Sequence, residues 1–220
     1  MATTERVAQR QNRERELIAA TRALFDERGM QDAPIEEIAK SVGIARGLIY
    51  RQFSSKEELY VATVADYLIE LASDLEEAEA QAGQDPVVRL ERMAEAYAGF
   101  CERYPAFLDS AVAIMRRPAG ELNSIISEVI WLRLGRAMVD CIDHVARILR
   151  AGNDAGVFQV DDPDFTANLL WTQMLGAMHL ARIRVGMKRT EAGLPELFRV
   201  DAEQVVRACV ESALATIRAA

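Results

Sequence analysis

The chain has 220 residues, of which 50% are hydrophobic and 27% are charged, and its formal net charge at pH 7 is −8. A chain of this length and composition can bury a substantial core as one or two domains, and its acidic balance argues against a protein that coats nucleic acid without selectivity. The sequence contains neither an 18-residue apolar run nor a signal peptide, so we expect a cytoplasmic protein with no membrane partner.

The charge is unevenly distributed along the chain. Residues 1–56 contain 10 Lys and Arg against 8 Asp and Glu, whereas the remainder contains 16 against 26. The basic excess therefore lies in the N-terminal part, as expected of a segment that contacts DNA phosphates. Part of it comes from arginines that suit either an arm along DNA or a solvated tail, namely Arg6, Arg10, Arg13 and Arg15.

Two helices are predicted at the start of the chain. The first covers residues 13–28 and stops at Gly29. The second, of about two turns, is opened by Pro34, because the missing N–H of proline costs nothing in a first helical turn. The apolar residues at helical spacing are Leu17, Ile18, Leu24 and Phe25 in the first helix, and Ile35, Ile38, Ala39 and Val42 in the second.

A tight turn at Gly43 and a third short helix follow, because glycine most readily takes the left-handed conformation that ends a helix. The buried side of this third helix consists of Ile44, either Leu48 or Ile49, and Phe53. Its outer side consists of Arg46, Gly47, Tyr50, Arg51 and Gln52. Two short helices joined by such a turn predict a helix-turn-helix that reads the DNA major groove.

A fourth helix is predicted to begin immediately after the third. Two overlapping capping boxes mark its start, one pairing Ser54 with Glu57 and the other pairing Ser55 with Glu58. Lys56 in the first turn is poorly placed for the helix dipole, but it is well placed to meet a phosphate.

These residues resemble the TetR family of bacterial transcriptional regulators. The resemblance covers roughly residues 12–60. It rests on the patterns Leu24-Phe25-x-x-x-Gly29, Ile35-x-x-Ile38-Ala39-x-x-Val42-Gly43, Gly47-x-x-Tyr50-x-x-Phe53 and Ser55-Lys56-x-x-Leu59. It implies an all-α protein, with a three-helix helix-turn-helix DNA-binding domain at residues 1–56. Residues 57–220 would then form a helical domain for effector binding and dimerisation.

The resemblance also implies roles for individual residues. Tyr50 and Lys56 are expected to contact phosphates, while Arg46, Gly47, Arg51 and Gln52 face bases or the groove wall. Arg46 is the best candidate for reading a base, because a guanidinium pairs bidentately with guanine O6 and N7. The chain departs from the family at Pro34, Ala45 and Leu48, where Ser or Thr is common. Hydroxyl contacts to phosphates, or a hydroxyl cap on the third helix, are therefore not expected from these three positions.

Beyond residue 60 the apolar periodicity remains helical and no strand pattern appears. Turn-forming residues divide this part into helices near 55–80, 87–103, 106–116, 121–155, 163–185 and 201–218. In the family, the two helices before the last commonly pair with their copies in a second subunit, which here means residues 121–155 and 163–185. The small residues of Leu175-Gly176-Ala177 permit close approach there, although they suit intramolecular packing as well.

Methionine and aromatic residues are spread over the helices that wall a ligand pocket in the family. Such side chains form adaptable apolar cavities, so the resemblance implies a small lipophilic or aromatic effector, although each residue also suits a core position. The expected ligand-binding residues are Tyr97, Phe100, Trp131, Trp171 and Met178. Arginines that suit either an anionic head group or solvent are Arg133, Arg136, Arg182 and Arg184.

No catalytic, cofactor or metal site is predicted, because nucleophile elbows, phosphate-binding glycine loops and paired zinc cysteines are missing from the sequence. Asp140 and His144, four residues apart, could share a metal, but a solvent-facing or interface pair is the better interpretation. The odd number and wide spacing of Cys101, Cys141 and Cys209 suit reduced core thiols.

The sequence therefore predicts a DNA-binding regulator and not an enzyme. We expect a repressor that binds a palindromic operator as a homodimer and is released by a small, mostly apolar effector. The effector would act through the helix of residues 55–80, which alone connects the two parts directly. The alternative is an effector-independent DNA-binding or architectural protein of the same fold that works through protein partners.

Overall fold

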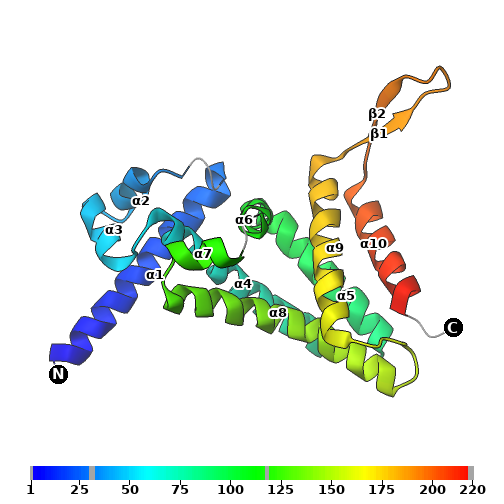
Figure 1. The fold of residues 1–220 in the computed structure, drawn as a ribbon, viewed down its shortest axis with the longest axis horizontal. Coiled ribbons are helices and arrows are strands. Elements are labelled where there is room, and N and C mark those ends of the chain that lie inside the picture. The colour runs from blue at the N-terminus through cyan, green and yellow to red at the C-terminus, as the bar shows by residue number, and fades with distance from the viewer. Residues whose placement is uncertain (1, 30–32, 117–118, 218–220) are drawn as a thin grey trace. The chain divides into compact units, whose positions relative to one another are not determined.

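The computed structural model describes residues 2–29, 33–116 and 119–217, and it confirms the predicted all-α class (Figure 1). The helices are α1 (Ala2–Arg28), α2 (Ile35–Ser41), α3 (Arg46–Gln52), α4 (Lys56–Gln81), α5 (Pro86–Arg103), α6 (Pro105–Met115), α7 (Ala119–Ile125), α8 (Glu128–Asp154), α9 (Pro163–Ile183) and α10 (Ala202–Ile217). The strands β1 (Val185–Arg189) and β2 (Pro195–Arg199) form an antiparallel hairpin between α9 and α10.

The chain divides into two compact units. The first combines the described residues of Met1–Glu70 with Tyr104–Met138, and the second combines Leu71–Arg103 with those of Val139–Ala220. This division differs from the expected boundary at residue 56, because the start of α4 and the segment from α6 onward pack with the helix-turn-helix. The prediction that residues 1–56 read DNA and residues 57–220 bind the effector concerns function, and it stays a prediction.

Helices α4 and α8 each contribute residues to both units. The expectation that the helix of residues 55–80 alone connects the two parts is therefore wrong. A sequence pattern shows which residues are adjacent along the chain, but it does not show which later helix returns to pack on an earlier one.

Helix α1 begins at Ala2, well before the predicted start at residue 13. Its early residues are exposed and largely polar, so they carry no apolar periodicity from which a helix could be recognised. Farther along, Leu17 and Phe25 are buried against a core that also contains Ile38 of α2 and Ile49 of α3. Packing in this core holds α3 against α1 and α2 within the first unit.

The predicted helix of residues 121–155 is two helices. The break lies between Ile125 and Glu128, where the backbone N–H of Ser127 donates to the carboxylate of Glu58 at 3.0 Å instead of continuing a helix. The Ser127 hydroxyl then accepts from the N–H of Ile130 in the first turn of α8 at 3.5 Å. A contact 69 positions away along the chain thus decides where α8 starts.

The hairpin corrects the expectation that no strand follows residue 60. Helix α9 ends at Arg184, whose φ of 56° is left-handed, and β1 and β2 then pair from Val185 opposite Arg199 to Arg189 opposite Pro195. Strand pairing depends on residues across the turn, so two five-residue segments rich in charge gave no strand signal.

Helices α9 and α10 lie side by side in the second unit, and α5 contacts both (Figure 1). The start of α9 follows the expected chemistry, since Pro163 occupies its first turn and the Asp162 side chain accepts from the N–H of Phe165 at 2.9 Å. Across the described ranges, no helix is both long and apolar enough to cross a membrane.

Candidate functional site

The turn of the helix-turn-helix has the predicted geometry. Gly43 has a φ of 70°, in the left-handed region, and the N–H of Ile44 donates to the carbonyl of Ala39 at 2.9 Å. Pro34 precedes α2 as its N-cap, so it is not the first helical residue, and its carbonyl accepts from the N–H of Glu37 at 3.0 Å. The turn therefore sets α3 at a defined angle to α2.

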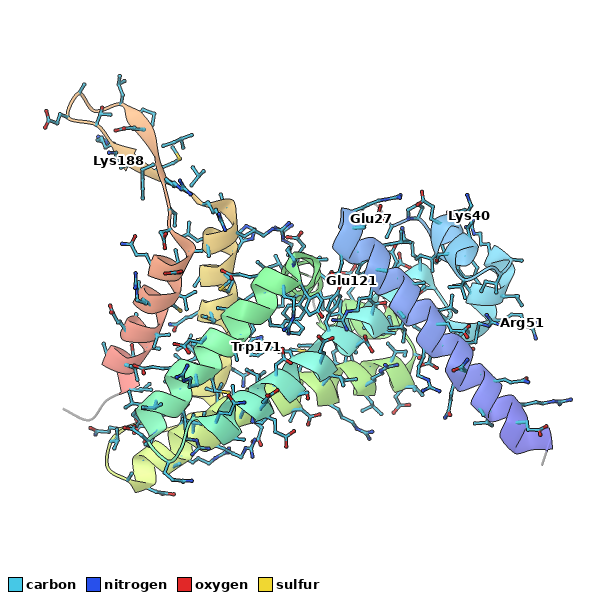
Figure 2. All side chains as sticks on the ribbon, turned by 180° about the vertical axis from the view of Figure 1, so that it is seen from behind. Glu27, Lys40, Arg51, Glu121, Trp171 and Lys188 are labelled. Carbon is cyan, nitrogen blue, oxygen red and sulfur yellow. The ribbon has the colours of Figure 1, made fainter. Side chains whose placement is uncertain are left out.

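Helix α3 separates a buried side from an exposed side. Ile49 and Phe53 are buried, whereas Leu48 is 40% exposed, so Ile49 is the core residue of the two alternatives. Ala45 precedes the helix without any side-chain cap, as its methyl group requires. The residues of the predicted outer side that are exposed are Arg46, Gly47, Tyr50 and Arg51, and Arg51 extends from α3 into solvent (Figure 2).

Arg46 is engaged by two neighbours on this exposed face. Its Nη1 lies 2.5 Å from Oε1 of Glu36 on α2, and its Nη2 donates to the hydroxyl of Tyr50 at 3.4 Å. The hydrogen bond to Tyr50 and the charge of Glu36 both raise the pKa of Arg46. The guanidinium proposed to read a base is thus held in place beside a carboxylate.

Gln52 and Lys56 make contacts within the protein. The Gln52 amide donates to Oε2 of Glu14 at 3.1 Å and to the carbonyl of Arg10 at 3.4 Å, which ties α3 to α1. Lys56 places its Nζ 4.9 Å from the ring centroid of Tyr60, whose hydroxyl donates to the carbonyl of Ala33. Lys56 thus stands in the first turn of α4, as predicted, over an aromatic ring.

Basic residues line a groove between the N-terminal half of α1 and helix α3. The groove has a volume of about 1120 Å³. Its basic residues are Arg6, Arg10, Arg13, Arg15 and Arg51. The N-terminal arginines therefore belong to a helix, and the signal that could have found this surface is the helical spacing of Arg6, Arg10 and Arg13.

Glu58 links the start of α4 to the start of α8. It is 4% exposed, and its two carboxylate oxygens accept from the backbone N–H of Ser127 at 3.0 Å and from that of Ser54. Burial raises the pKa of Glu58, but these hydrogen bonds outweigh burial and hold the pKa below its usual value. Of the two capping boxes, the one that forms places the Ser55 hydroxyl 3.0 Å from the N–H of Glu58.

A second set of polar contacts connects α8 to α3, the proposed recognition helix, within the first unit. Nη1 of Arg133 lies 3.0 Å from Oε1 of Glu14, and the other oxygen of Glu14 accepts from Gln52 on α3. Asp66 lies 4.0 Å from the same guanidinium. The sequence pattern does not predict these contacts, because the residues lie far apart along the chain; for Arg133 it predicts only an anionic ligand or solvent as the partner.

A cavity of about 70 Å³ lies among α4, α5, α8, α9 and α10 of the second unit. Of the expected ligand residues, Tyr97 and Trp171 line it, with their ring centroids 5.0 Å apart in an edge-to-face arrangement. Figure 2 labels Trp171. Phe100 and Met178 are buried but lie outside its walls, and Trp131 belongs to the first unit. Residues that the expectation missed include Leu75, Leu90, Met93, Val145 and Cys209.

The cavity walls are almost entirely apolar. None of the described residues that line it is charged, and the arginines considered for an anionic head group are not among them. Tyr97 is 3% exposed, and its hydroxyl makes no hydrogen bond in the described structure. Burial raises the pKa of the nearby Cys101 thiol to about 12 and that of Cys141 likewise to about 12, so both behave as the expected core thiols.

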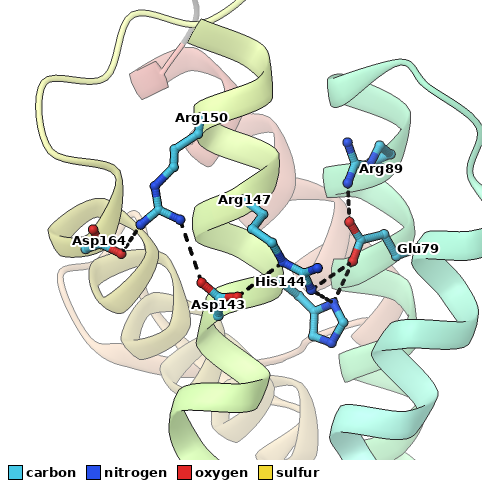
Figure 3. A network of polar contacts seen from close by, with 7 residues as sticks. All are labelled: Glu79, Arg89, Asp143, His144, Arg147, Arg150 and Asp164. Atoms are coloured by element: carbon cyan, nitrogen blue, oxygen red, sulfur yellow. Dashed lines mark hydrogen bonds and ion pairs between the residues drawn. The ribbon is translucent and has the colours of Figure 1, made fainter. Parts of the chain in front are cut away.

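His144 belongs to a polar network that joins α4, α5, α8 and α9 (Figure 3). Its Nδ1 lies 2.6 Å from Oε2 of Glu79, which also pairs with Arg89, while Arg147 lies between the histidine and Asp143. His144 is therefore a buried member of the helix packing, and the expectation of a solvent-facing or interface pair with Asp140 is wrong. Within the described ranges, no group of three or more His, Cys, Asp or Glu side chains is placed to hold a metal ion.

Comparison with known proteins finds a family match in the N-terminal part of the chain. Residues 17–63 match the model of the family described as bacterial regulatory proteins, tetR family. The chain is 38% identical over 74 residues to the HTH-type transcriptional regulator BetI of Stenotrophomonas maltophilia, a match that covers 34% of this chain and 38% of that protein. It is 33% identical over 93 residues to the HTH-type transcriptional activator FasR of Mycolicibacterium smegmatis, covering 42% of each.

The matches to these curated relatives thus span only about two fifths of their length. A longer likeness is found to the solved structure of RolR in complex with resorcinol, with a TM-score of 0.67 over 96% of this chain and 90% of that one. Its sequence identity of 16% means that this likeness concerns the fold. Together with the matched helix-turn-helix, it leads to one conclusion: residues 17–63 have the N-terminal DNA-binding sequence of the tetR family of bacterial regulatory proteins, and the chain as a whole shares the fold of RolR.

Proposed function

We propose that the protein is a transcriptional repressor that binds a palindromic operator as a homodimer. The observation that carries this proposal is the exposed face of α3, on which the turn at Gly43 presents Arg46, Tyr50 and Arg51 to solvent. The basic groove along α1 supplies further positive charge for phosphates beside this face. A regulator of bacterial genes works where the DNA lies, which places it in the cytoplasm.

The dimer follows from how such a protein reads DNA. TetR-family regulators bind DNA and act as dimers, and two recognition helices can read successive major grooves only when an interface fixes their separation. One matched relative is named an activator and the other a regulator. The names of these relatives therefore do not support repression, which we propose from the way in which an effector would weaken DNA binding.

The cavity of the second unit supports a small, neutral and largely apolar effector. Its walls carry no charged residue among those described, and Tyr97 and Trp171 meet edge to face, an arrangement that also suits an aromatic guest. RolR, a protein of the same fold, binds resorcinol in its solved structure. By analogy of fold, a small aromatic molecule is the class of effector to test first.

The small size of the cavity connects binding to a conformational change. A volume of about 70 Å³ is less than the roughly 150 Å³ of a cavity known to accept benzene, so even one aromatic ring must move the walls. Two of the residues in those walls are Leu75 of α4 and Val145 of α8. The hydrogen bond between Ser127 and Glu58 joins the starts of these two helices, and α4 begins directly after α3. Displacing the two helices would therefore turn the recognition helix, and a coupling of about 1 to 3 kcal/mol lowers DNA affinity roughly 5- to 150-fold.

The test is the reciprocity of effector and operator binding. A panel of small aromatic compounds is first screened by thermal shift, because a ligand bound only by the folded state raises the apparent stability. A confirmed ligand should then weaken operator binding in fluorescence anisotropy, and saturating operator should weaken the ligand by the same factor. Ala94→Val, whose two added methyl groups occupy part of the cavity without the bulk of an aromatic ring, should weaken ligand binding and leave operator binding intact.

The same experiment distinguishes the repressor from the alternative class of function. If a ligand bound in this cavity has equal affinity with and without operator, the repressor mechanism fails. The effector-independent DNA-binding or architectural protein would then be the better description of the chain.

A further inference from the structure

The two faces of the hairpin formed by β1 and β2 differ: one has an apolar centre, and the other carries an ion pair together with Phe198. Side chains alternate between the faces of a strand, and the register pairs Met187 with Leu197 on one face and Lys188 with Glu196 on the other. Lys188 and Glu196 form an ion pair at 3.4 Å. Val185 and Pro195 share the face of Met187 and lie opposite Arg199 and Arg189, so that face is apolar at its centre and has an arginine at each end.

This apolar face is open to solvent in the single chain. Met187 is 71% exposed and Leu197 66%, and Leu194 at the tip is 64% exposed. The side chains around Lys188 extend away from α9 and α10 (Figure 2). An isolated two-stranded hairpin is marginally stable in water, and exposed apolar surface that gathers in one place marks an interaction site. The hairpin therefore requires a surface to cover it.

An exposed stripe on α9 leads directly into this face. Six exposed residues at helical spacing form the stripe, namely Phe165, Leu169, Thr172, Gly176, Leu180 and Ile183. Only Arg184 separates Ile183 from Val185, so the stripe and the hairpin face follow one another along the chain. The stripe lies on a helix that the proposed homodimer uses, and a surface continuous with it is best covered by the same partner.

The charge of the hairpin region also favours a second copy of this chain as the partner that covers the apolar face. Residues 182–199 contain five Lys and Arg and two Glu, whereas the rest of residues 57–220 contains 11 Lys and Arg against 24 Asp and Glu. A basic arm on an otherwise acidic C-terminal region is complementary to that region of an identical chain. Arg189 and Arg199 belong to the apolar face itself, at its two ends, where they can meet carboxylates of the partner.

We propose that the hairpin is a dimerisation arm whose apolar face, built around Met187 and Leu197, packs on the C-terminal helices of a second copy of this chain. This inference rests on the proposed homodimer and adds a specific element to it. The arm enlarges the interface beyond a pair of helices, and it restricts pairing to chains that carry the same arm and the same acidic surface.

Two matched double variants test the arm in the full-length protein. Met187→Ser with Leu197→Ser removes the apolar pair, and Lys188→Ser with Glu196→Ser removes the neighbouring pair on the opposite face. Sedimentation equilibrium should show a dimer dissociation constant at least roughly tenfold higher for the first variant and one changed less than about twofold for the second. Circular dichroism of both variants checks that the helices remain folded.

Photo-crosslinking identifies what covers the face. A benzoylphenylalanine in place of Met187 should yield, on irradiation, a covalent dimer whose crosslinked peptide lies in the C-terminal helices. An unchanged dissociation constant for the first variant, or crosslinks only within one chain or to added operator DNA, overturns the proposal. A dimer that survives this variant but dissociates on Leu169→Arg disproves the arm alone, whereas a wild-type monomer at micromolar concentration disproves the proposed homodimer as well.

Discussion

Glu36 and Arg46 form an ion pair on the face of the protein where DNA is proposed to bind. Both side chains are more than half exposed, so the pair contributes little to folding stability. Its effect on DNA binding is larger, because the carboxylate orients the guanidinium and at the same time repels phosphates. The two partners therefore have opposite expected effects when each is removed.

Arg46→Ala should relax base preference. We expect operator affinity to fall roughly tenfold and affinity for random duplex to change little, because the lost contact is to a base edge. Fluorescence anisotropy with both duplexes measures the difference. Equal losses on the two duplexes would show that Arg46 contacts a phosphate instead.

Glu36→Gln should tighten binding to operator and random duplex alike. Removing one negative charge beside the phosphates favours association, and we expect an increase of roughly two- to fivefold at low salt that shrinks as salt is raised. The same titration repeated at several salt concentrations is the measurement. A weaker complex would mean that the orientation of Arg46 by Glu36 matters more than the repulsion.

Lys56→Gln should reduce the salt dependence of DNA binding. One phosphate contact fewer lowers the slope of log affinity against log salt by roughly one. Lys188→Gln, on the hairpin, is the charge-matched control and should leave the slope unchanged. An unchanged slope for Lys56→Gln would remove this residue from the proposed DNA contacts.

At the scale of elements, Glu58 fastens the beginning of α8 to the beginning of α4. Its pKa is lowered in the folded protein, so its charged form stabilises the fold at pH values above its unfolded pKa of about 4.3. This stabilisation is lost as the pH falls through the lower pKa of the folded state. Acid should therefore loosen the junction between α4 and α8.

Glu58→Gln should lower the free energy of unfolding at pH 7 by about 1 to 3 kcal/mol, since a neutral amide accepts the two backbone hydrogen bonds more weakly. The difference from wild type should shrink toward the pH at which Glu58 itself is protonated. Denaturant unfolding between pH 3 and pH 7 measures this trend, with the exposed Glu57→Gln as the control. A pH-independent difference would contradict the assigned charge state.

At the scale of the whole molecule, the exposed stripe of α9 refines the expected dimer surface. Leu175 is 5% exposed and Ala177 is half-buried, so of the small-residue segment Gly176 is the residue that lies on the stripe. Leu169, about two turns before Gly176, is 41% exposed. The interface is therefore expected along this stripe rather than over the whole segment.

Leu169→Arg should dissociate the homodimer. A guanidinium buried between two apolar stripes lacks a partner, and we expect the dissociation constant to rise roughly 100-fold, with loss of binding to a full operator. Asn168→Arg, exposed but off the stripe, should remain dimeric in size-exclusion chromatography with light scattering. A dimeric Leu169→Arg protein would move the interface elsewhere.

The parts of the molecule that the sequence predicts well are those governed by local chemistry. The left-handed Gly43, the cap before α4 and the proline at the start of α9 each depend on residues within one or two turns of one another. Boundaries of α4, α5 and α6 were accordingly predicted to within a residue or two. Exposure of Arg46 and Tyr50 follows from the same local periodicity.

Long-range contacts decided the rest. The bond from Ser127 to Glu58 divides one predicted helix into α7 and α8, the pairing of β1 with β2 turns a predicted loop into a hairpin, and Gln52 faces α1 because Glu14 lies there. The sequence by itself determined the resemblance of residues 12–60 to the TetR family, the helix-turn-helix and the apolar character of the C-terminal helices. Only the tertiary structure decided that Tyr97 and Trp171 share a cavity while Trp131 does not, because which apolar faces meet depends on packing between distant segments that no local pattern encodes.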